Sequence, residues 1–409
     1  MNKVAIIGVG HTKFGILQDQ GLIELLCDAS MEAINDSNVT QEEIDTVYVG
    51  TMCSGEFNQI TGVANNLVDR LSLIPAAADH IENGPASGGS AIKTGVQAIA
   101  SGLSSMVLVV GGEKMTHINT PGFITSTVAT LTHHEAERRH GASLPSFAGL
   151  LTRAYLNKYD AKLDWISDVA IKNHRNGKLN PRAHFQKSIE EFMQSAIKKG
   201  KGNWNDIHEF LKDDRTNPVI ADPLRLFHIC PISDGAAAVL LCDAEIAKKY
   251  CDTPILVSGI GQATDTHIVH EREDITVLNA LRISSDKAYA MAQKAPDKMD
   301  VAELHDAFEI LEVVESEDIG FFKKGQGAKA AHDGLTQIGG KIPINPSGGL
   351  KARGHPLGAT GVAQVVELVW QLRGEAGKRQ VSGANTGISC NFGGFGNNII
   401  TIIVERMQN

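Results

Sequence analysis

Short apolar runs that reach glycine alternate with stretches of helical periodicity along this chain. Residues 4–9 form such a run around Gly8 and Gly10, and residues 106–110 form another before Gly111 and Gly112. Residues 22–34 and 92–99 place apolar side chains at the spacing of one helix face. Continuous apolar runs suit strands that are covered on both faces. The alternation of the two patterns therefore predicts a layered α/β fold.

The same pattern returns in the second part of the chain. Residues 255–260 again form a β-branched run that enters a predicted turn at Gly259 and Gly261, and the last apolar run is 398–404. Residues 113–216 differ, because they are rich in His, Lys, Arg and Asn and contain the basic run 198–201. We therefore expect two α/β halves, at 1–112 with 217–250 and at 251–409. A loop domain at 113–216 is inserted into the first half, and the active site lies where the halves meet.

Composition excludes several classes of protein. Hydrophobic residues make up 42% and charged residues 21%, as in ordinary globular proteins. The net charge of -9 argues against a general nucleic-acid or anionic-membrane binder. No apolar run reaches the roughly 18 residues of a membrane span, and the N-terminus lacks a signal-peptide pattern. The six cysteines lack zinc-site spacing. These observations predict a cytoplasmic protein with reduced thiols and without a metal of its own.

Four segments carry the chemical signal. They are residues 230–238, which begin Cys-Pro-Ile-Ser-Asp-Gly; 302–308, with Leu-His-Asp-Ala-Phe; 345–361, with Arg-Gly-His-Pro-Leu-Gly; and 390–396, Cys-Asn-Phe-Gly-Gly-Phe-Gly. In this order and spacing they resemble the thiolase superfamily, especially its sterol-carrier-type and archaeal branch, over essentially the whole chain. The resemblance implies duplicated βαβαβαββ halves in an αβαβα arrangement of layers, and chemistry on an acyl-CoA.

The segment around His355 is the most specific evidence for this resemblance. Pro356 suits the first turn of a helix, so His355 is predicted at a helix N-terminus, where a neighbouring anion is stabilised. Taken alone, the histidine could equally cap that helix. In thiolases the matching histidine activates the nucleophilic cysteine, and the residue that matches His305 helps to form an oxyanion hole. The resemblance further implies pocket positions at Gly84, Pro85, Ser87, Asn391 and Gly394, and substrate contacts at Ser347 and Gly348.

Pro85 stands where the family places its nucleophile. Residues 82–88 read Glu-Asn-Gly-Pro-Ala-Ser-Gly, against Glu-x-x-Cys-Ala-Ser-Gly in thiolases. Proline has neither a nucleophile nor a backbone N–H, so covalent catalysis from this position is excluded. One interpretation moves the nucleophile to Cys390, whose motif converges with that of His355 in the family. Cys230 is interpreted as part of a structural turn, and Ser87 as support for the loop.

Three functions stay open. The favoured one is thiolysis of a β-ketoacyl-CoA, with a branched or aromatic acyl group, in which Cys390 is the nucleophile. The second is retro-aldol cleavage of a β-hydroxyacyl-CoA without a covalent intermediate, which has less need of His355. The third is a non-catalytic scaffold subunit that binds acyl-CoA, and the presence of both His305 and His355 weighs against it.

The resemblance also implies a cofactor and partners. Coenzyme A is the expected co-substrate, and basic residues between Arg138 and Lys201 are candidates for contact with its phosphates. Members of the family are dimers at least, so a homodimer is expected. In this branch a small zinc-ribbon/OB-fold subunit often completes the CoA entrance, and any metal belongs to that partner.

Overall fold

The computed structural model describes residues 3–120 and 122–407, and these contain a mixed sheet of nine strands in the order β3-β2-β4-β7-β1-β8-β11-β10-β9. The first half of the chain supplies β1 (Val4–His11), β2 (Thr46–Gly50), β3 (Ala77–Ile81), β4 (Met106–Glu113) and β7 (Gly235–Asp243). The second half supplies β8 (Ile255–Thr264), β9 (Val301–Glu303), β10 (Thr386–Gly393) and β11 (Asn398–Arg406).

The two halves of the sheet share one topology. In the first, β1 and β4 each pair antiparallel with β7, and β2 pairs parallel with β4 and β3. In the second, β8 and β10 each pair antiparallel with β11, and β9 pairs parallel with β10. The halves join through β1 and β8. A counterpart of β3 is reduced, within the described chain, to a parallel bridge between Ala302 and Ile344. The predicted α/β class with duplicated halves is confirmed.

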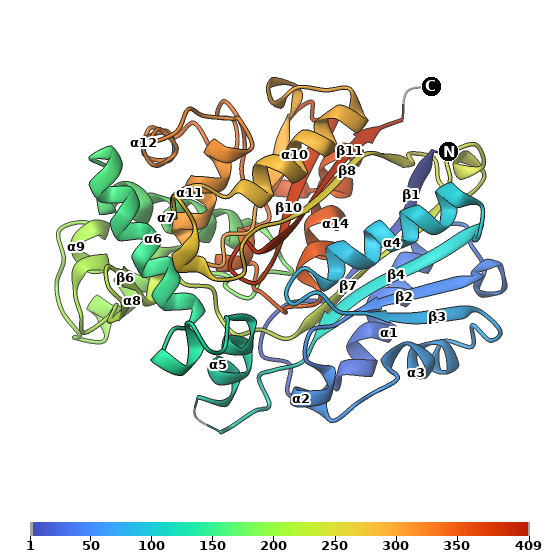
Figure 1. Cartoon of the computed structure of the whole chain (residues 1–409), viewed down its shortest axis with the longest axis horizontal. Helices are drawn as coiled ribbons and strands as arrows, with labels where there is room; N and C mark the ends of the chain where they lie inside the picture. Colours follow the sequence, from blue (N-terminus) through green and yellow to red (C-terminus); the bar gives the residue numbers. More distant parts are fainter. Residues whose placement is uncertain (1–2, 121, 408–409) are drawn as a thin grey trace.

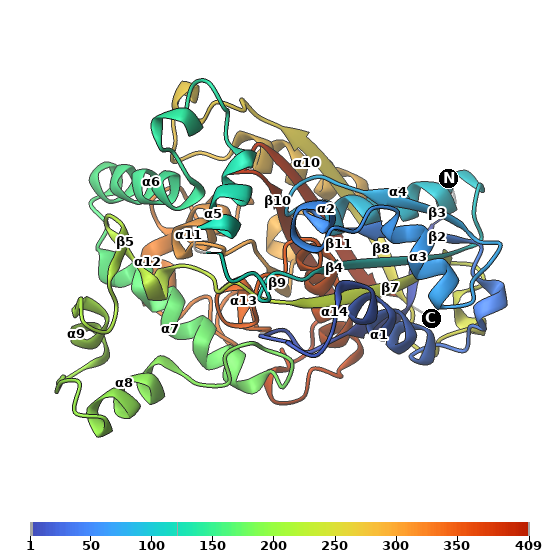
Figure 2. The same cartoon turned by 90° about the horizontal axis from the view of Figure 1, so that it is seen from below.

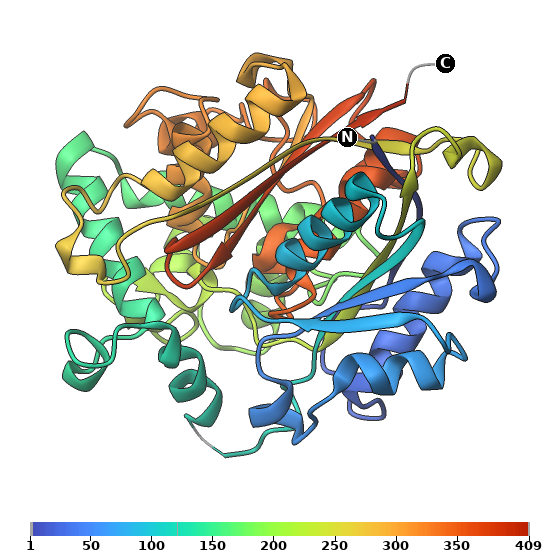
Figure 3. The same ribbon diagram turned by 45° about the vertical axis from the view of Figure 1, so that its right-hand side comes forward.

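Two helices form the middle layer of the fold. Helices α4 (Ser87–Ser101) and α14 (Thr360–Arg373) lie between the two halves of the sheet (Figure 3). Helix α14 packs against strands of both halves and is buried on every side over most of its length, because it has a sheet on either flank. Helices α1 (Leu22–Asn35) and α10 (Asn279–Ala292) cover the outer faces (Figure 1). The order of layers is therefore αβαβα.

The glycines of the first strand in each half serve helix packing. A Cβ at Gly8 or Gly10 would overlap backbone atoms of α1, and one at Gly259 or Gly261 would overlap backbone atoms of α10. Both strands continue past these glycines, so the turn predicted at Gly259 and Gly261 is wrong. Only glycine lets a helix backbone approach a strand this closely, which explains why the same pattern occurs in both halves.

The chain leaves the sheet between β4 and β7. This segment forms α5 (Phe123–Val128), α6 (Leu144–Tyr159), α7 (Leu163–Leu179), α8 (Ile189–Lys198), α9 (Ile207–Lys212) and a hairpin of β5 (Val219–Ala221) with β6 (Leu224–Arg225). The helices α6 to α9 gather on the side opposite to β3 (Figure 2). Helix α7 packs against α11 (Glu309–Asp318), α12 (Gly327–His332) and α13 (Gly349–Ala352). Across residues 3–120 and 122–407, no helix has the length and apolar character that a membrane crossing needs.

Candidate active site

A cavity of about 170 Å³ brings together several of the predicted site residues. His305 reaches it from the loop after β9, His355 from the loop before α14, and Gly394 from the turn after β10. Pro85, in the loop before α4, also lines it. Helix α5, the first turn of α6, the segment 229–232 before β7 and the residues around Phe308 contribute most of the other walls. The cavity is thus built from both halves and from the segment between β4 and β7.

His355 is held as a neutral imidazole. Its Nδ1 lies 2.7 Å from the Thr360 hydroxyl, which itself donates to the carbonyl of Pro356 at 3.0 Å. Because that hydroxyl proton is already used, Nδ1–H is assigned as the donor and Nε2 is left with a lone pair. Burial, and then the Arg353 guanidinium, lower the pKa of His355 to about 3. His355 therefore presents an unprotonated nitrogen, Nε2, to a molecule in the cavity.

Helix α14 starts later than the sequence predicts. Its first residue is Thr360 rather than Pro356, and residues 357–359 form a turn. The backbone N–H of Gly358 donates to the buried Glu113 carboxylate at 3.1 Å, and a side chain at Gly358 would overlap the backbone of β2 and β4. This contact holds the turn against the sheet, so His355 precedes the helix instead of capping it.

His305 is the second neutral imidazole of the cavity. Its ring stacks on Phe392 with centroids 5.0 Å apart, and meets the His355 ring edge-to-face at 5.1 Å. The backbone N–H of His305 donates to Glu315 at 3.0 Å, which fixes the loop. Burial, then His355 and Arg353, lower the pKa of His305 well below its ordinary value. Its buried Nδ1 has no hydrogen-bond partner among the described residues. A neutral ring in this position can donate one N–H to a carbonyl oxygen.

The loop that carries Pro85 keeps its supporting contacts. The Ser87 hydroxyl donates to the carbonyl of Gly84 at 2.6 Å and accepts from the backbone N–H of Asn83 at 2.9 Å. The Asn391 side chain donates to the carbonyl of Pro85 at 3.1 Å. Ser87 and Asn391 therefore hold the loop and do not line the cavity. The loop presents a pyrrolidine ring to the cavity, at a position that has no N–H donor.

The structure does not support Cys390 as the nucleophile. Successive side chains of a strand point to opposite faces, and Asn391 faces α4, where it accepts from the backbone N–H of Gly89 at 3.1 Å. The Cys390 thiol lies in the core on the other face, 4.0 Å from the Thr401 hydroxyl. It is fully buried and does not line the cavity. Burial, and then Glu315, raise the pKa of Cys390 well above its ordinary value, which disfavours a thiolate.

Cys230 is the site residue that sequence reasoning missed. Of the six cysteines, all of which fall in the described part of the chain, this one lines the cavity. Its backbone N–H donates to the carbonyl of Ala307 at 3.0 Å, so the segment before β7 lies beside the His305 loop. Burial raises the pKa of the Cys230 thiol to about 12. The motif that begins at Cys230 was recognised and interpreted as a structural turn, and only the long-range pairing with Ala307 brings its thiol to the cavity.

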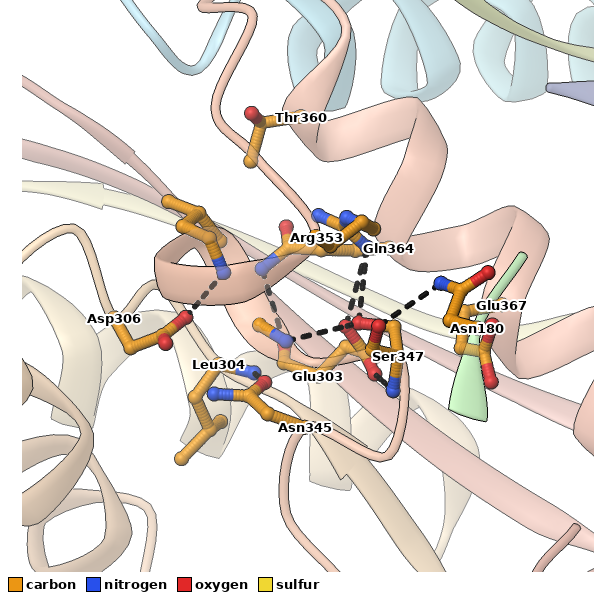
Figure 4. Close-up of polar contacts among 12 residues, drawn as sticks. Asn180, Glu303, Leu304, Asp306, Asn345, Ser347, Arg353, Thr360, Gln364 and Glu367 are labelled. Atoms are coloured by element: carbon orange, nitrogen blue, oxygen red, sulfur yellow. Dashed lines mark hydrogen bonds and ion pairs between the residues drawn. The ribbon is translucent and has the colours of Figure 1, made fainter. Parts of the chain in front are cut away.

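Ser347 and Gly348 do not line the cavity, so the expected substrate contacts are not supported. The backbone N–H and the hydroxyl of Ser347 donate to Glu303 at 3.1 and 2.7 Å, and Arg353 pairs with Glu303 at 3.2 Å (Figure 4). A side chain at Gly348 would overlap the backbone of Gly177. This buried network ties β9 to the loop that carries His355, and Arg353 acts as a local structural charge.

Comparison of the sequence with known protein families identifies the family of this chain. The family described as thiolase, N-terminal domain, matches residues 4–245, and the thiolase C-terminal domain-like family matches residues 261–406. This chain belongs to the thiolase superfamily. It is 41% identical to an acetyl-CoA acetyltransferase of Methanothermobacter thermautotrophicus, over 99% of this chain and 100% of that protein. It is 31% identical to human sterol carrier protein 2, over 98% of this chain and 72% of that protein. The resemblance drawn from the motifs, including its branch, is confirmed.

The fold also matches solved thiolase-like structures. The Ltp2-ChsH2(DUF35) aldolase has a TM-score of 0.80 at 21% identity, over 100% of this chain and 99% of that one. Within this thiolase fold, the site can accept a proton at Nε2 of His355 and donate a hydrogen bond from His305. At the position of the usual nucleophile it has only the ring of Pro85.

Proposed function

We propose that this protein is a C–C lyase that cleaves a β-hydroxyacyl-CoA by a retro-aldol reaction and forms the same bond in the reverse direction. One observation carries the proposal: two neutral histidines, His305 and His355, meet in the cavity that Pro85 lines in place of a nucleophile. Thiolysis was favoured from sequence because retro-aldol cleavage has less need of His355, and Cys390 was the expected nucleophile. His355 can accept the proton in either reaction, whereas that form of thiolysis also needs the Cys390 thiol in the cavity. The burial of Cys390 on the other face of β10 removes that support.

The proposed reaction needs one base and one hydrogen-bond donor. Nε2 of His355 accepts the proton of the β-hydroxyl group. The bond between Cα and Cβ then breaks, its electron pair moves to the thioester carbonyl as an enolate, and Cβ becomes an aldehyde or ketone. The His305 N–H stabilises the enolate oxygen. The imidazolium of His355 returns the proton to Cα, so no free CoA is consumed and no acyl-enzyme forms.

Thiolysis of a β-ketoacyl-CoA is the second candidate, and Cys230 is the observation that favours it. This thiol lines the same cavity as His355. As a nucleophile it would give its proton to Nε2 of His355 and attack the β-carbonyl of the β-ketoacyl-CoA. The bond between Cα and Cβ then breaks, the acyl group stays on the thiol, and the leaving thioester enolate takes the proton from His355 at Cα. A CoA thiol would then remove the acyl group. The pKa of about 12 makes the starting thiolate scarce, which is why we rank this reaction second.

A matched pair of substrates separates the two reactions. We expect the β-hydroxyacyl-CoA to be cleaved without added CoA, and the β-ketoacyl-CoA of the same acyl group to be cleaved slowly or not at all. Because the proposed reaction uses no thiol, Cys230→Ser and Cys390→Ser should keep the rate within about twofold. Product formation is followed by chromatography, and a covalent acyl-enzyme is sought by mass spectrometry of the quenched protein.

The opposite results have distinct meanings. Cleavage of the β-keto thioester that requires free CoA, with an acyl adduct that Cys230→Ser abolishes, establishes thiolysis instead. If Cys390→Ser abolishes the acyl adduct and Cys230→Ser does not, the reaction is thiolysis with Cys390 as the nucleophile. If neither thioester is cleaved although both bind, the scaffold function becomes the better account.

The pH dependence of cleavage tests the state of His355. Its pKa of about 3 lies below the ordinary value of 6.5, so the basic form persists as the pH falls from 7 to 5. We expect kcat/KM to show no protonation step of His355 near pH 6.5. Protonation of His355 should lower kcat/KM only as the pH approaches 3. The pKa of the nearby Glu113 is raised to about 7 by burial and could add a step of its own. Burial also raises the pKa values of Glu303 and Asp306 to about 7, so His355 is titrated directly by NMR of its imidazole, and a protonation step of His355 near pH 6.5 contradicts the assignment.

The assembly and cellular setting are also proposals. We propose a cytoplasmic homodimer that acts on CoA thioesters with a small zinc-ribbon/OB-fold partner subunit. Strand β3 supports the dimer, because it ends the sheet and its side chains at Ala77, Asp79 and His80 are exposed. Such an edge is ready to pair with a second strand.

The name of the solved aldolase complex includes a DUF35 component, which supports a partner subunit here.

A further inference from the structure

The walls of the active-site cavity are hydrocarbon. Apart from the two histidines, its surface is formed mainly by Ile124, Val128, Leu144, Phe308, Leu311 and Phe395. Of the described residues that line it, none is Asp, Glu, Lys or Arg. The side chains that can ionise there are His305, His355 and Cys230. All three are neutral near pH 7, since burial lowers the pKa of the histidines and raises that of the thiol. The cavity therefore has no counterion for a charged ligand group.

The volume of the cavity limits the size of the group that fills it. An apolar protein cavity of about 150 Å³ is large enough to bind benzene, and this one measures about 170 Å³. The thioester carbonyl and the β-carbon take part of this space beside the two histidines, and a methyl group on Cβ would leave much of the rest without contacts to the surrounding walls. A carboxylate would lose its hydration without gaining a partner.

We propose that the substrate carries on Cβ an uncharged apolar group about the size of a benzene ring, either aromatic or branched aliphatic. The aldehyde or ketone released by cleavage is then apolar as well. The reaction step rests on the proposed lyase function, whereas the preference for the acyl group rests on the cavity alone. Binding can therefore be tested without turnover.

Three thioesters that lack a β-hydroxyl group provide the test. Butanoyl-CoA, 3-phenylpropanoyl-CoA and succinyl-CoA carry on Cβ a methyl, a phenyl and a carboxylate group, and cannot undergo retro-aldol cleavage. Their dissociation constants are measured by calorimetry on the full-length protein. We expect the phenyl compound to bind at least about tenfold more tightly than butanoyl-CoA, and succinyl-CoA at least about tenfold more weakly.

Variants of the wall test whether this cavity causes the preference. Val128→Phe fills the space, so it should weaken binding of 3-phenylpropanoyl-CoA about tenfold and leave butanoyl-CoA almost unchanged. Ala129→Leu also adds bulk, at the neighbouring wall position, and is used if the first variant does not fold. The control is Leu103→Phe, at a position that is 86% exposed, and it should change neither constant.

The outcomes separate this inference from the proposed reaction. Succinyl-CoA that binds as tightly as the phenyl compound, or wall variants that leave the preference unchanged, overturn the inference. If the preference holds but the matching β-hydroxy thioester is not cleaved, the lyase function fails and the assignment of the acyl group stands. If cleavage occurs without any preference for the phenyl group, only the acyl group has been wrongly assigned.

Discussion

Replacing His355 with alanine is expected to lower kcat for cleavage of a β-hydroxyacyl-CoA by a factor of about 10² to 10⁴. The variant loses the nitrogen that accepts the hydroxyl proton, while the apolar walls that hold the acyl group stay in place. Binding of the non-cleavable 3-phenylpropanoyl-CoA should therefore change little. Steady-state kinetics and calorimetry on the same preparation separate the two effects.

Two further variants make the His355 experiment specific. His134→Ala removes an exposed histidine outside the cavity and should leave kcat unchanged. Thr360→Val removes the oxygen that accepts from Nδ1 of His355, so it should lower kcat less than His355→Ala does and alter the pH profile. The proposed mechanism is refuted if His355→Ala cleaves the substrate at the rate of the unmodified protein.

Replacing Arg353 with alanine is expected to lower the free energy of unfolding by about 3–5 kcal/mol. Glu303 is fully buried, and Arg353 is its ion-pair partner at 3.2 Å. Hydrogen bonds from Ser347 remain in the variant, but the buried carboxylate loses its counterion. Urea unfolding at fixed pH measures the difference.

The pH dependence of that loss has a defined sign. In the folded protein the pKa of Glu303 is raised by burial to about 7, against an ordinary value of 4.5, although Arg353 opposes the rise. Without Arg353 the pKa rises further, and the variant retains a proton that the unmodified protein releases above pH 7. The destabilisation should therefore be larger at pH 8 than at pH 6. Arg175→Ala breaks an exposed pair with Glu190 and serves as the control, with an expected loss within about 1 kcal/mol. Equal losses for the two variants contradict the structural role of Arg353.

The sequence allowed the fold and half of the site to be predicted. Apolar periodicity is a local property, so the strands around Gly8 and Gly259 could be recognised without a structure. The purpose of their glycines could not, because it depends on a helix that approaches from another part of the chain. The helix after His355 was placed too early for a similar reason, since the turn at Gly358 is held by Glu113 from β4.

The catalytic residues were also predicted only in part from the sequence. The identity of Pro85 already excluded the usual nucleophile, because proline lacks a nucleophile and an N–H in any fold. The motifs around His305 and His355 established the superfamily and named the two histidines that share the cavity. Only the tertiary structure decided which thiol accompanies them. Strand alternation turns Cys390 into the core, and a long-range pairing brings Cys230 to the cavity wall. Residue identity sets which reactions a side chain can perform, whereas its direction and burial, which depend on distant segments, decide whether it meets the substrate.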